Sequence, residues 1–276
     1  MGKVKNNFQN RTRISTFVGR LSNRTSSLIS MSHDSITFYP YQVHPREVDF
    51  TKRATLFSLG DSILHTAGED ADRTGFGVRN LQQHNTTWVL SRMAIEIERY
   101  PDEYEHYEIG TWISEIGRMM TTRNFIVRDN DGNRIAAAST NWAIIDMQSR
   151  RPLDLRANVS SYSETPIHEC PIEAPRRIAG FTGEMVDDRY VRYSEIDFNQ
   201  HTNTMKYIQW MMDTLPLSRL QDTSIHRMDI NFIHETRYGE HLRIYHDTLA
   251  TEERFEIRRA SDELSVCRAS FQWKEQ

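Results

Sequence analysis

The chain has 276 residues, 38% of them hydrophobic, and its mean hydropathy of −0.66 is typical of a water-soluble globular protein. It lacks any apolar run of about 18 residues, so no membrane span is expected. The formal net charge is −4, but residues 1–30 hold six Lys or Arg and no acid, so the remainder carries −10 and nucleic acid is not expected as the main partner.

The two cysteines and the N-terminal segment limit the cellular setting. Cys170 and Cys267 lie far apart without a second ligand pair, which favours neither a disulfide framework nor a zinc site and makes reducing cytosol the default. Residues 1–33 are expected to be a disordered leader or the result of a mis-called start. Their acid-poor, Arg- and Ser-rich composition is typical of an organellar transit peptide, whereas Met31 offers an alternative start.

The first predicted elements in chain order are a helix and four strands. The helix runs through Leu56 to a stop at Gly68. Residues 92–112 predict a strand, a short polar turn and another strand, and two further strand-like runs follow at residues 123–129 and 134–146.

A long connection and a second set of similar elements follow. Four of the eight prolines fall within residues 150–177, where neither a period of 2 nor one of 3.6 is sustained. The next predicted helix stops at Pro216, and residues 227–247 again predict a strand, a turn and a strand. The last strand-like runs are residues 253–260 and 263–273.

The two sets are predicted to be copies of one unit. "RMAIEIERYPDEYEHYEIGTW" (92–112) aligns without gaps on "RMDINFIHETRYGEHLRIYHD" (227–247), and "VDFTKR" (48–53) on "IDFNQH" (196–201). One helix and about four antiparallel strands, duplicated, predict an α+β fold in which each sheet wraps around a central helix. The expected N-terminal repeat, linker and C-terminal repeat are residues 34–149, 150–188 and 189–276.

The two copies carry different polar residues at matching positions. The second copy carries Asp197, Asn199, His201 and Glu235. The matching residues of the first copy are Asp49, Thr51, Arg53 and Tyr100. The shared aspartate fits a structural role, whereas three residues present in one copy only favour a functional one. Simpler interpretations stay open: Asn199 could cap the helix, His201 could be a polar residue of its first turn, and Glu235 could be a solvated hairpin charge.

A carboxylate, a carboxamide and an imidazole beside a helix N-terminus suit hydrolysis of an activated acyl group. Glu235 would activate water or attack the carbonyl, Asn199 would orient either group, and His201 would orient groups or protonate the leaving group. Free N–H groups of the helix would stabilise the carbonyl oxygen as it gains negative charge. A thiol, with a pKa of about 8.5, leaves readily, which points to a thioester. Neither cysteine has a base nearby in sequence, so a cysteine nucleophile is not expected.

Four segments together resemble the acyl-acyl-carrier-protein (acyl-ACP) thioesterases, in a form closer to bacterial members than to plant plastid enzymes. They are "TTWVLSRMAIEIERYPDEYEHYEIGTW", "GEDADRTGFG", "RNFIVRDNDGNRIAAASTNWAIID" and "IDFNQHTNTMKYIQWMMD", and the resemblance runs from about residue 38 to residue 273. It implies a double hotdog fold, a bacterial cytoplasmic location, and release of a fatty acid from acyl carrier protein carrying a fatty acyl-phosphopantetheine, with no metal or cofactor. It also implies active-site roles for Asp197, Asn199, His201 and Glu235.

The resemblance carries further implications for individual positions. Plant members have a Cys directly after the Glu; Thr236 stands here, which favours water activated by Glu235. The first repeat would shelter the acyl chain, with walls that could equally be plain core residues: Trp88, Met93, Ile95 and Trp142. A basic group near the linker is a candidate docking surface for the carrier protein or simply a solvated face: Arg150, Arg151, Arg156, Arg176 and Arg177.

Three other functions stay open at this point. An acyl-CoA thioesterase would use the same chemistry. A hotdog hydratase or dehydratase also uses an acid with a His, and "DFNQH" faintly resembles its pattern with one residue missing. A non-catalytic sensor would bind an acyl thioester without releasing thiol. Either a monomer or a homodimer is compatible with a double hotdog, because one chain already contains the pairing of two hotdog units.

Overall fold

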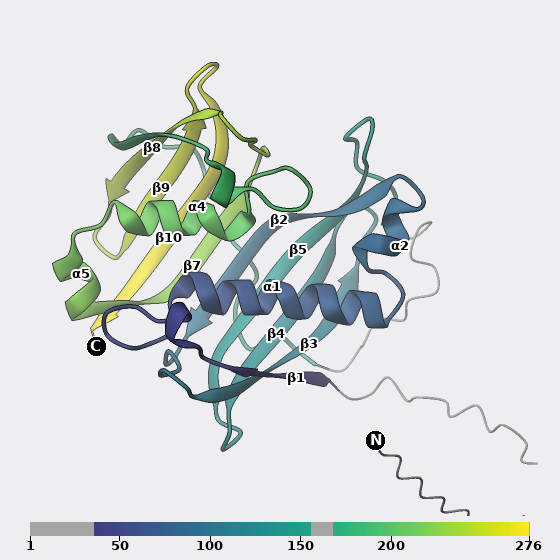
Figure 1. The fold of residues 1–276 in the computed structure, drawn as a ribbon, viewed down its shortest axis with the longest axis horizontal. Helices are drawn as coiled ribbons and strands as arrows, with labels where there is room; N and C mark the ends of the chain where they lie inside the picture. The colour runs from purple at the N-terminus through teal and green to yellow at the C-terminus, as the bar shows by residue number, and fades with distance from the viewer. Residues whose placement is uncertain (1–35, 156–167, 276) are drawn as a thin grey trace, which may run out of the picture. The chain divides into compact units, whose positions relative to one another are not determined.

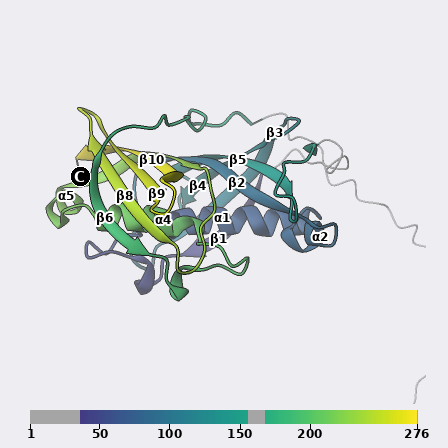
Figure 2. The same ribbon diagram turned by 90° about the horizontal axis from the view of Figure 1, so that it is seen from above.

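The computed structural model describes residues 36–155 and 168–275, and the predicted leader at residues 1–33 lies outside them. One ten-stranded antiparallel sheet carries the helices on one face (Figures 1 and 2). This arrangement confirms the predicted α+β class with sheets wrapped around helices. Among the described residues, no helix is long and apolar enough to cross a membrane.

Within the described residues, each half of the sequence supplies five strands. The first half forms β1 (Thr37–Gln42), η1 (Pro45–Glu47), α1 (Leu56–Arg73), α2 (Val78–Gln82), β2 (Thr86–Ile97), β3 (His106–Ile116), β4 (Thr121–Asp129) and β5 (Arg134–Asp146). The second forms β6 (Glu184–Tyr190), η2 (Tyr193–Glu195), α4 (Thr204–Asp213), α5 (Leu217–Asp222), β7 (Thr223–Phe232), β8 (His241–Thr248), β9 (Glu252–Arg259) and β10 (Leu264–Glu275).

The strand order is the same in both halves, read outward from the centre of the sheet. The order is β1-β3-β4-β5-β2-β7-β10-β9-β8-β6, so the halves meet where β2 pairs with β7. The strands predicted on either side of each polar turn are confirmed as β2 and β3 and as β7 and β8, but the two strands of each unit are not neighbours in the sheet. Each half has one strand more than the sequence predicts, because β1 and β6 add to the two outer edges.

The helices place apolar faces against the sheet. Leu59, Ile63 and Ala67 of α1 are buried at helical spacing, as are Met205 and Ile208 of α4. They share one core with the inward-facing residues of the strands. Any cavity between the helices and the sheet is therefore enclosed on one side by α1 and α4.

The predicted stop of the first helix at Gly68 is wrong. α1 continues to Arg73, because Asp70 and Ala71 still lie on its buried face and Asp70 forms an ion pair with Arg123 of β4 at 2.7 Å. The helix ends instead before Gly75, which has a φ of +85°. The extra turn and a half carries α1 across the first half of the sheet.

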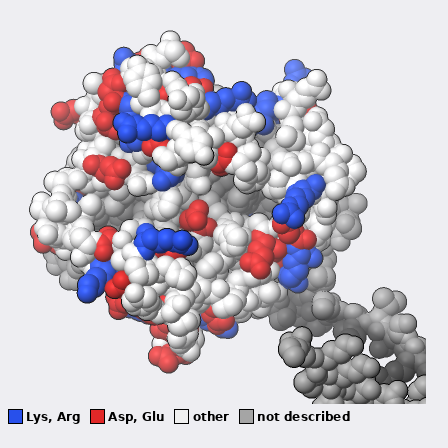
Figure 3. Space-filling model, viewed as in Figure 1, with Lys and Arg blue, Asp and Glu red and all other residues white. Residues whose placement is uncertain are grey.

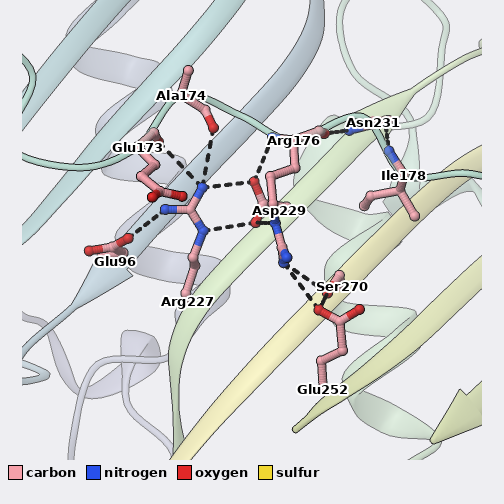
Figure 4. A network of polar contacts seen from close by, with 10 residues as sticks. All are labelled: Glu96, Glu173, Ala174, Arg176, Ile178, Arg227, Asp229, Asn231, Glu252 and Ser270. Atoms are coloured by element: carbon pink, nitrogen blue, oxygen red, sulfur yellow. Dashed lines mark hydrogen bonds and ion pairs between the residues drawn. The ribbon is translucent and has the colours of Figure 1, made fainter. Parts of the chain in front are cut away.

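The described part of the linker crosses the sheet on the face opposite the helices (Figures 2 and 4). Arg176 donates to the fully buried carboxylate of Asp229 from both its backbone N–H and its Nε, each at 2.8 Å. Arg227 donates to the same carboxylate and also to Glu96 of β2. Arg176 thus binds a buried carboxylate on the sheet. Arg156, which belongs to the candidate docking surface for the carrier protein, lies outside the described residues.

Candidate active site

The loop of residues 197–201 is shaped by Asp197. Its Oδ1 accepts hydrogen bonds from the backbone N–H groups of Asn199 at 2.8 Å and His201 at 3.1 Å. Its own N–H donates to the His201 carbonyl at 2.8 Å, which closes the turn. Gln200 takes a φ of +66° within it. The contacts of Asp197 are therefore those of a residue that builds the turn.

The start of α4 lies directly after this loop. Its N-cap is Asn203, whose side-chain oxygen accepts from Met205 N–H at 2.9 Å, so the open interpretation of Asn199 as the cap is wrong. Thr204, the first residue of the helix, lines the neighbouring cavity. The positive end of the helix dipole is therefore directed toward that cavity.

The cavity has a volume of about 360 Å³ and brings the predicted polar residues together. Its polar wall contains Asp197, Asn199, His201 and Glu235. The Nε2 of His201 lies 3.4 Å from the Oε2 of Glu235. The His201 side chain is 15% exposed and that of Glu235 38%, so the carboxylate faces the cavity while staying open to water.

Two arginines that the sequence argument did not connect with the site flank this pair. Arg150, in the turn after β5, forms an ion pair with the Oε2 of Glu235. The Nη2 of Arg237 lies 3.5 Å from the Nε2 of His201. The two side chains place positive charge on either side of the acid and the imidazole, and could attract an anionic substrate.

The residue after Glu235 has no access to the cavity. Thr236 is fully buried, and its hydroxyl shares hydrogen bonds with Thr202 at 2.6 Å and Tyr207 at 2.9 Å. Cys267 is also fully buried, and burial raises the pKa of its thiol well above the ordinary value. Neither side chain has the exposure that a nucleophile beside Glu235 would need.

The rest of the cavity is largely apolar, and most of it comes from the first half of the sequence. Leu64 and Ala67 of α1 and Leu90 of β2 line it, together with Trp88 and Trp142. The other two candidate wall residues, Met93 and Ile95, are fully buried in the main core and do not line this cavity. A long apolar group could thus lie between α1 and the sheet with one end at Glu235.

A buried ion pair contributes to the cavity wall. Arg123 lines the wall and pairs with Asp70. Burial raises the pKa of the Asp70 carboxyl, but the nearby Arg123 charge and its hydrogen bonds outweigh this, so the net pKa is lowered. Within residues 36–155 and 168–275, no cluster of three or more His, Cys, Asp or Glu residues could hold a metal ion.

Comparisons with known proteins identify the family of the chain. The models for the N-terminal and C-terminal domains of acyl-ACP thioesterases match residues 36–162 and 182–275. A chloroplastic palmitoyl-acyl carrier protein thioesterase of Arabidopsis thaliana is 29% identical over 186 residues, which are 62% of this chain and 43% of the relative. A chloroplastic acyl-ACP hydrolase of Cuphea viscosissima is 24% identical over 80% of this chain and 58% of its own length. The chain thus spans about half the length of these plant relatives.

Solved structures show the same fold. An acyl-ACP thioesterase from Bacteroides thetaiotaomicron is 34% identical, with a TM-score of 0.81, over 87% of this chain and 98% of the solved one. The 12:0-ACP thioesterase from Umbellularia californica has a TM-score of 0.76 at 19% identity, over 87% of this chain and 98% of its own, and at that identity it supports the fold alone.

Proposed function

The chain belongs to the acyl-ACP thioesterase family, and from this premise we propose that it hydrolyses fatty acyl-ACP to a free fatty acid and the carrier protein. The observation that carries the proposal is the contact of His201 with Glu235 at the polar end of an apolar cavity. The matching positions of the first repeat hold Arg53 and Tyr100 instead. The proposed setting is the bacterial cytoplasm, with the C-terminal repeat catalytic and the N-terminal repeat holding the acyl chain.

The proposed reaction begins with a water molecule bound between Glu235 and the thioester carbonyl. Glu235 takes one proton from the water while the oxygen of the water attacks the carbonyl carbon. Asn199 orients the water or the carbonyl, and the positive end of the α4 dipole, at Thr204, stabilises the negative charge that develops on the carbonyl oxygen. The tetrahedral intermediate then collapses, the carbon–sulfur bond breaks, and the departing sulfur takes a proton from His201, which is replaced by the proton that Glu235 received, because the two side chains lie 3.4 Å apart. A free carboxylic acid and a free thiol result.

The apolar wall supports a fatty acyl group as the substrate. Its side chains from α1 and β2 would contact the methylene chain, each buried CH₂ contributing about 0.8 kcal/mol. Arg150 and Arg237, beside the polar end, provide positive charge for the phosphopantetheine or for the acidic carrier protein. Turnover should therefore depend on both the acyl chain and its carrier.

Thiol release from a panel of acyl-ACP thioesters of varied chain length tests the proposal. We expect thiol and fatty acid in equal amounts, and faster turnover on acyl-ACP than on acyl-CoA with the same acyl group. Comparable or faster turnover on the CoA ester would assign an acyl-CoA thioesterase instead. Binding without thiol release would indicate a sensor, and loss of water from a 3-hydroxyacyl thioester without free thiol would indicate a dehydratase.

A further inference from the structure

A second cavity, of about 670 Å³, occupies the position that the duplication assigns to a copy of the first. In the sheet, Leu90 pairs with Trp142 in the first half and Ile225 with Trp273 in the second. The former pair lines the first cavity and the latter pair lines the second. The same bulge follows in both halves, so the two walls are built in the same way.

The two helices contribute to both cavities in reciprocal fashion. The N-terminal part of α1, including Phe57, lines the second cavity, whereas its later residue Leu64 lines the first. Conversely, α4 presents Thr204 to the first cavity and Met212 to the second. Seen from the side of the helices, the surface is hollowed between them, with both positive and negative side chains at the border (Figure 3).

The polar groups of the second cavity differ from those of the first. Arg53 takes the place of His201, and Tyr100 takes the place of Glu235. The Tyr100 hydroxyl donates to the Ile225 carbonyl at 3.2 Å, and burial raises its pKa, so the phenol stays neutral. Among the described residues that line this cavity there is no His or Glu. The imidazole–carboxylate pair of the first cavity is therefore replaced on this wall by a guanidinium and a neutral phenol.

The charges that remain favour an anion. Three cations line the cavity, Arg46, Arg53 and Lys206, against two carboxylates, Asp49 and Asp213. Asp49 Oδ1 already accepts hydrogen bonds from both the N–H and the hydroxyl of Thr51, as a turn-building aspartate does. The Nε of Arg53 donates to the Thr51 hydroxyl at 3.1 Å, which orients the side chain within the cavity wall, and its planar guanidinium has the geometry that matches a carboxylate.

We propose that the second cavity binds the carboxylate of a long-chain fatty acid without chemical turnover, with Arg53 at the head group. The chain would lie along Met212, Leu220, Ile225 and Trp273, in a space of the size that lipid-like ligands commonly occupy. The choice of a fatty acid rests on the proposed function, because that reaction releases a fatty carboxylate. The duplicated fold would thus pair a site that makes the product with a site that holds it.

Calorimetric titration of the full chain with dodecanoate tests the proposal. We expect Arg53→Gln to weaken binding at this site at least about tenfold, as loss of a charge-assisted hydrogen bond does, and Arg53→Lys to restore part of it. Lys52→Gln removes an equal charge from an exposed neighbour that does not line the cavity, and should change affinity less than about twofold. Unchanged binding in Arg53→Gln, or an equal loss in Lys52→Gln, would overturn the proposal.

A second measurement locates the ligand even where Arg53→Gln perturbs folding. The bromine of ω-bromododecanoate should quench the fluorescence of Trp273, and Trp273→Phe should remove that component while Trp142→Phe leaves it. Competition should be stronger with dodecanoate than with dodecanol, which has the same chain without the charge. Quenching that ignores Trp273, or equal competition by the alcohol, would rule out the proposed site.

The result can be separated from the fate of the proposed function. The titrations are repeated in Glu235→Gln, where dodecanoate binding to the second cavity should persist regardless of hydrolysis. Intact binding at Arg53 with no thiol release from the wild-type chain would overturn the hydrolase proposal only. Thiol release with no Arg53-dependent binding would overturn the second site only.

Discussion

The two loops that precede the helices have nearly the same backbone and different chemistry. The aspartate N–H donates to the carbonyl four residues on at 2.9 Å from Asp49 and 2.8 Å from Asp197. Its Oδ1 accepts the N–H two residues on in both loops, at 2.7 and 2.8 Å. Lys52 and Gln200 have φ values of +63° and +66°. The aspartates build the turn, and the residues that the turn presents determine what it can do.

The same difference between shared backbone and different side chains appears in the connections β2–β3 and β7–β8, which lie opposite the two loops. The backbone N–H of Thr202 donates to the Thr236 carbonyl at 2.8 Å, and that of Ala54 donates to the Pro101 carbonyl at 2.9 Å, so each loop is joined to its connection by one equivalent bond. The residue before this acceptor is Glu235 in one copy and Tyr100 in the other. The comparison teaches that one scaffold position can carry either a base or a buried phenol.

The largest expected effect is a loss of kcat when the carboxylate of Glu235, in the second copy, is removed. Glu235→Gln keeps the shape of the side chain and removes the basic oxygen, so kcat should fall by a factor of about 10²–10⁴, the range for a general base. Thiol release in single-turnover experiments checks this. Glu263→Gln, the same change at an exposed carboxylate of the same repeat, should leave kcat near wild type. A fall of less than tenfold in Glu235→Gln would remove Glu235 as the base.

The partner residue should be coupled to Glu235. His201→Gln should lower kcat about a hundredfold, because it removes the imidazole 3.4 Å from the carboxylate. The double variant with Glu235→Gln should be only slightly slower than Glu235→Gln alone, since residues that act as a unit are not additive. The double-mutant cycle in kcat measures this. Fully multiplicative losses would mean that the two side chains act separately.

A smaller effect is expected where the copies differ on the opposite face of the sheet. Asp229 of β7 corresponds to Ala94 of β2, which packs in a small apolar cluster with Ala137 and Ile172. Asp229→Asn should lower the free energy of unfolding by about 2 kcal/mol, because charged hydrogen bonds to two arginines are lost. Urea unfolding at neutral pH checks this value.

Acid should reduce the difference in unfolding free energy between the wild type and Asp229→Asn. Burial raises the pKa of the Asp229 carboxyl, but the hydrogen bonds from Arg227 and Arg176 outweigh it, so the folded pKa lies below the unfolded value of about 3.9. Its contribution to stability is therefore present above that value and is lost as the pH falls through the folded pKa. The wild type and Asp229→Asn should converge in unfolding free energy on acidification. A gap that stays constant down to the acid transition would contradict this account.

The fold could be predicted from sequence where side chains alternate or repeat clearly. The central strands carry apolar residues on one face, and the two halves align residue by residue. β6 was missed because its sequence, EMVDDRY, is mostly exposed and acidic, as suits an edge strand. β1 was missed because it contains Pro40, which argues against a strand in sequence although an edge strand tolerates it. The sequence predicts a stop at Gly68, because it does not show the ion pair between Asp70 and Arg123 that holds the helix beyond this residue.

The site could be predicted only as far as the duplication reached. Asn199, His201 and Glu235 stood out because the sister copy lacks them. Arg150 lies 85 residues before Glu235 and meets it only through the fold, so no spacing indicated the contact. The second cavity was equally hidden, because the sequence shows that Arg53 replaces His201 but not that the space beside it remains open.

The smallest expected effect concerns the core of the two halves. Cys267 lies opposite Phe232, and its counterpart Ala136 lies opposite Ile97, so Cys267→Ala makes the second copy resemble the first. Because burial raises the pKa of the thiol and no surface of Cys267 is exposed, kcat should stay within about twofold of wild type. The lost sulfur contact should cost roughly 1 kcal/mol of unfolding free energy. A large fall in kcat at a temperature where the variant remains folded would indicate that the Cys267 thiol is the nucleophile. It would contradict the proposal that Glu235 activates water.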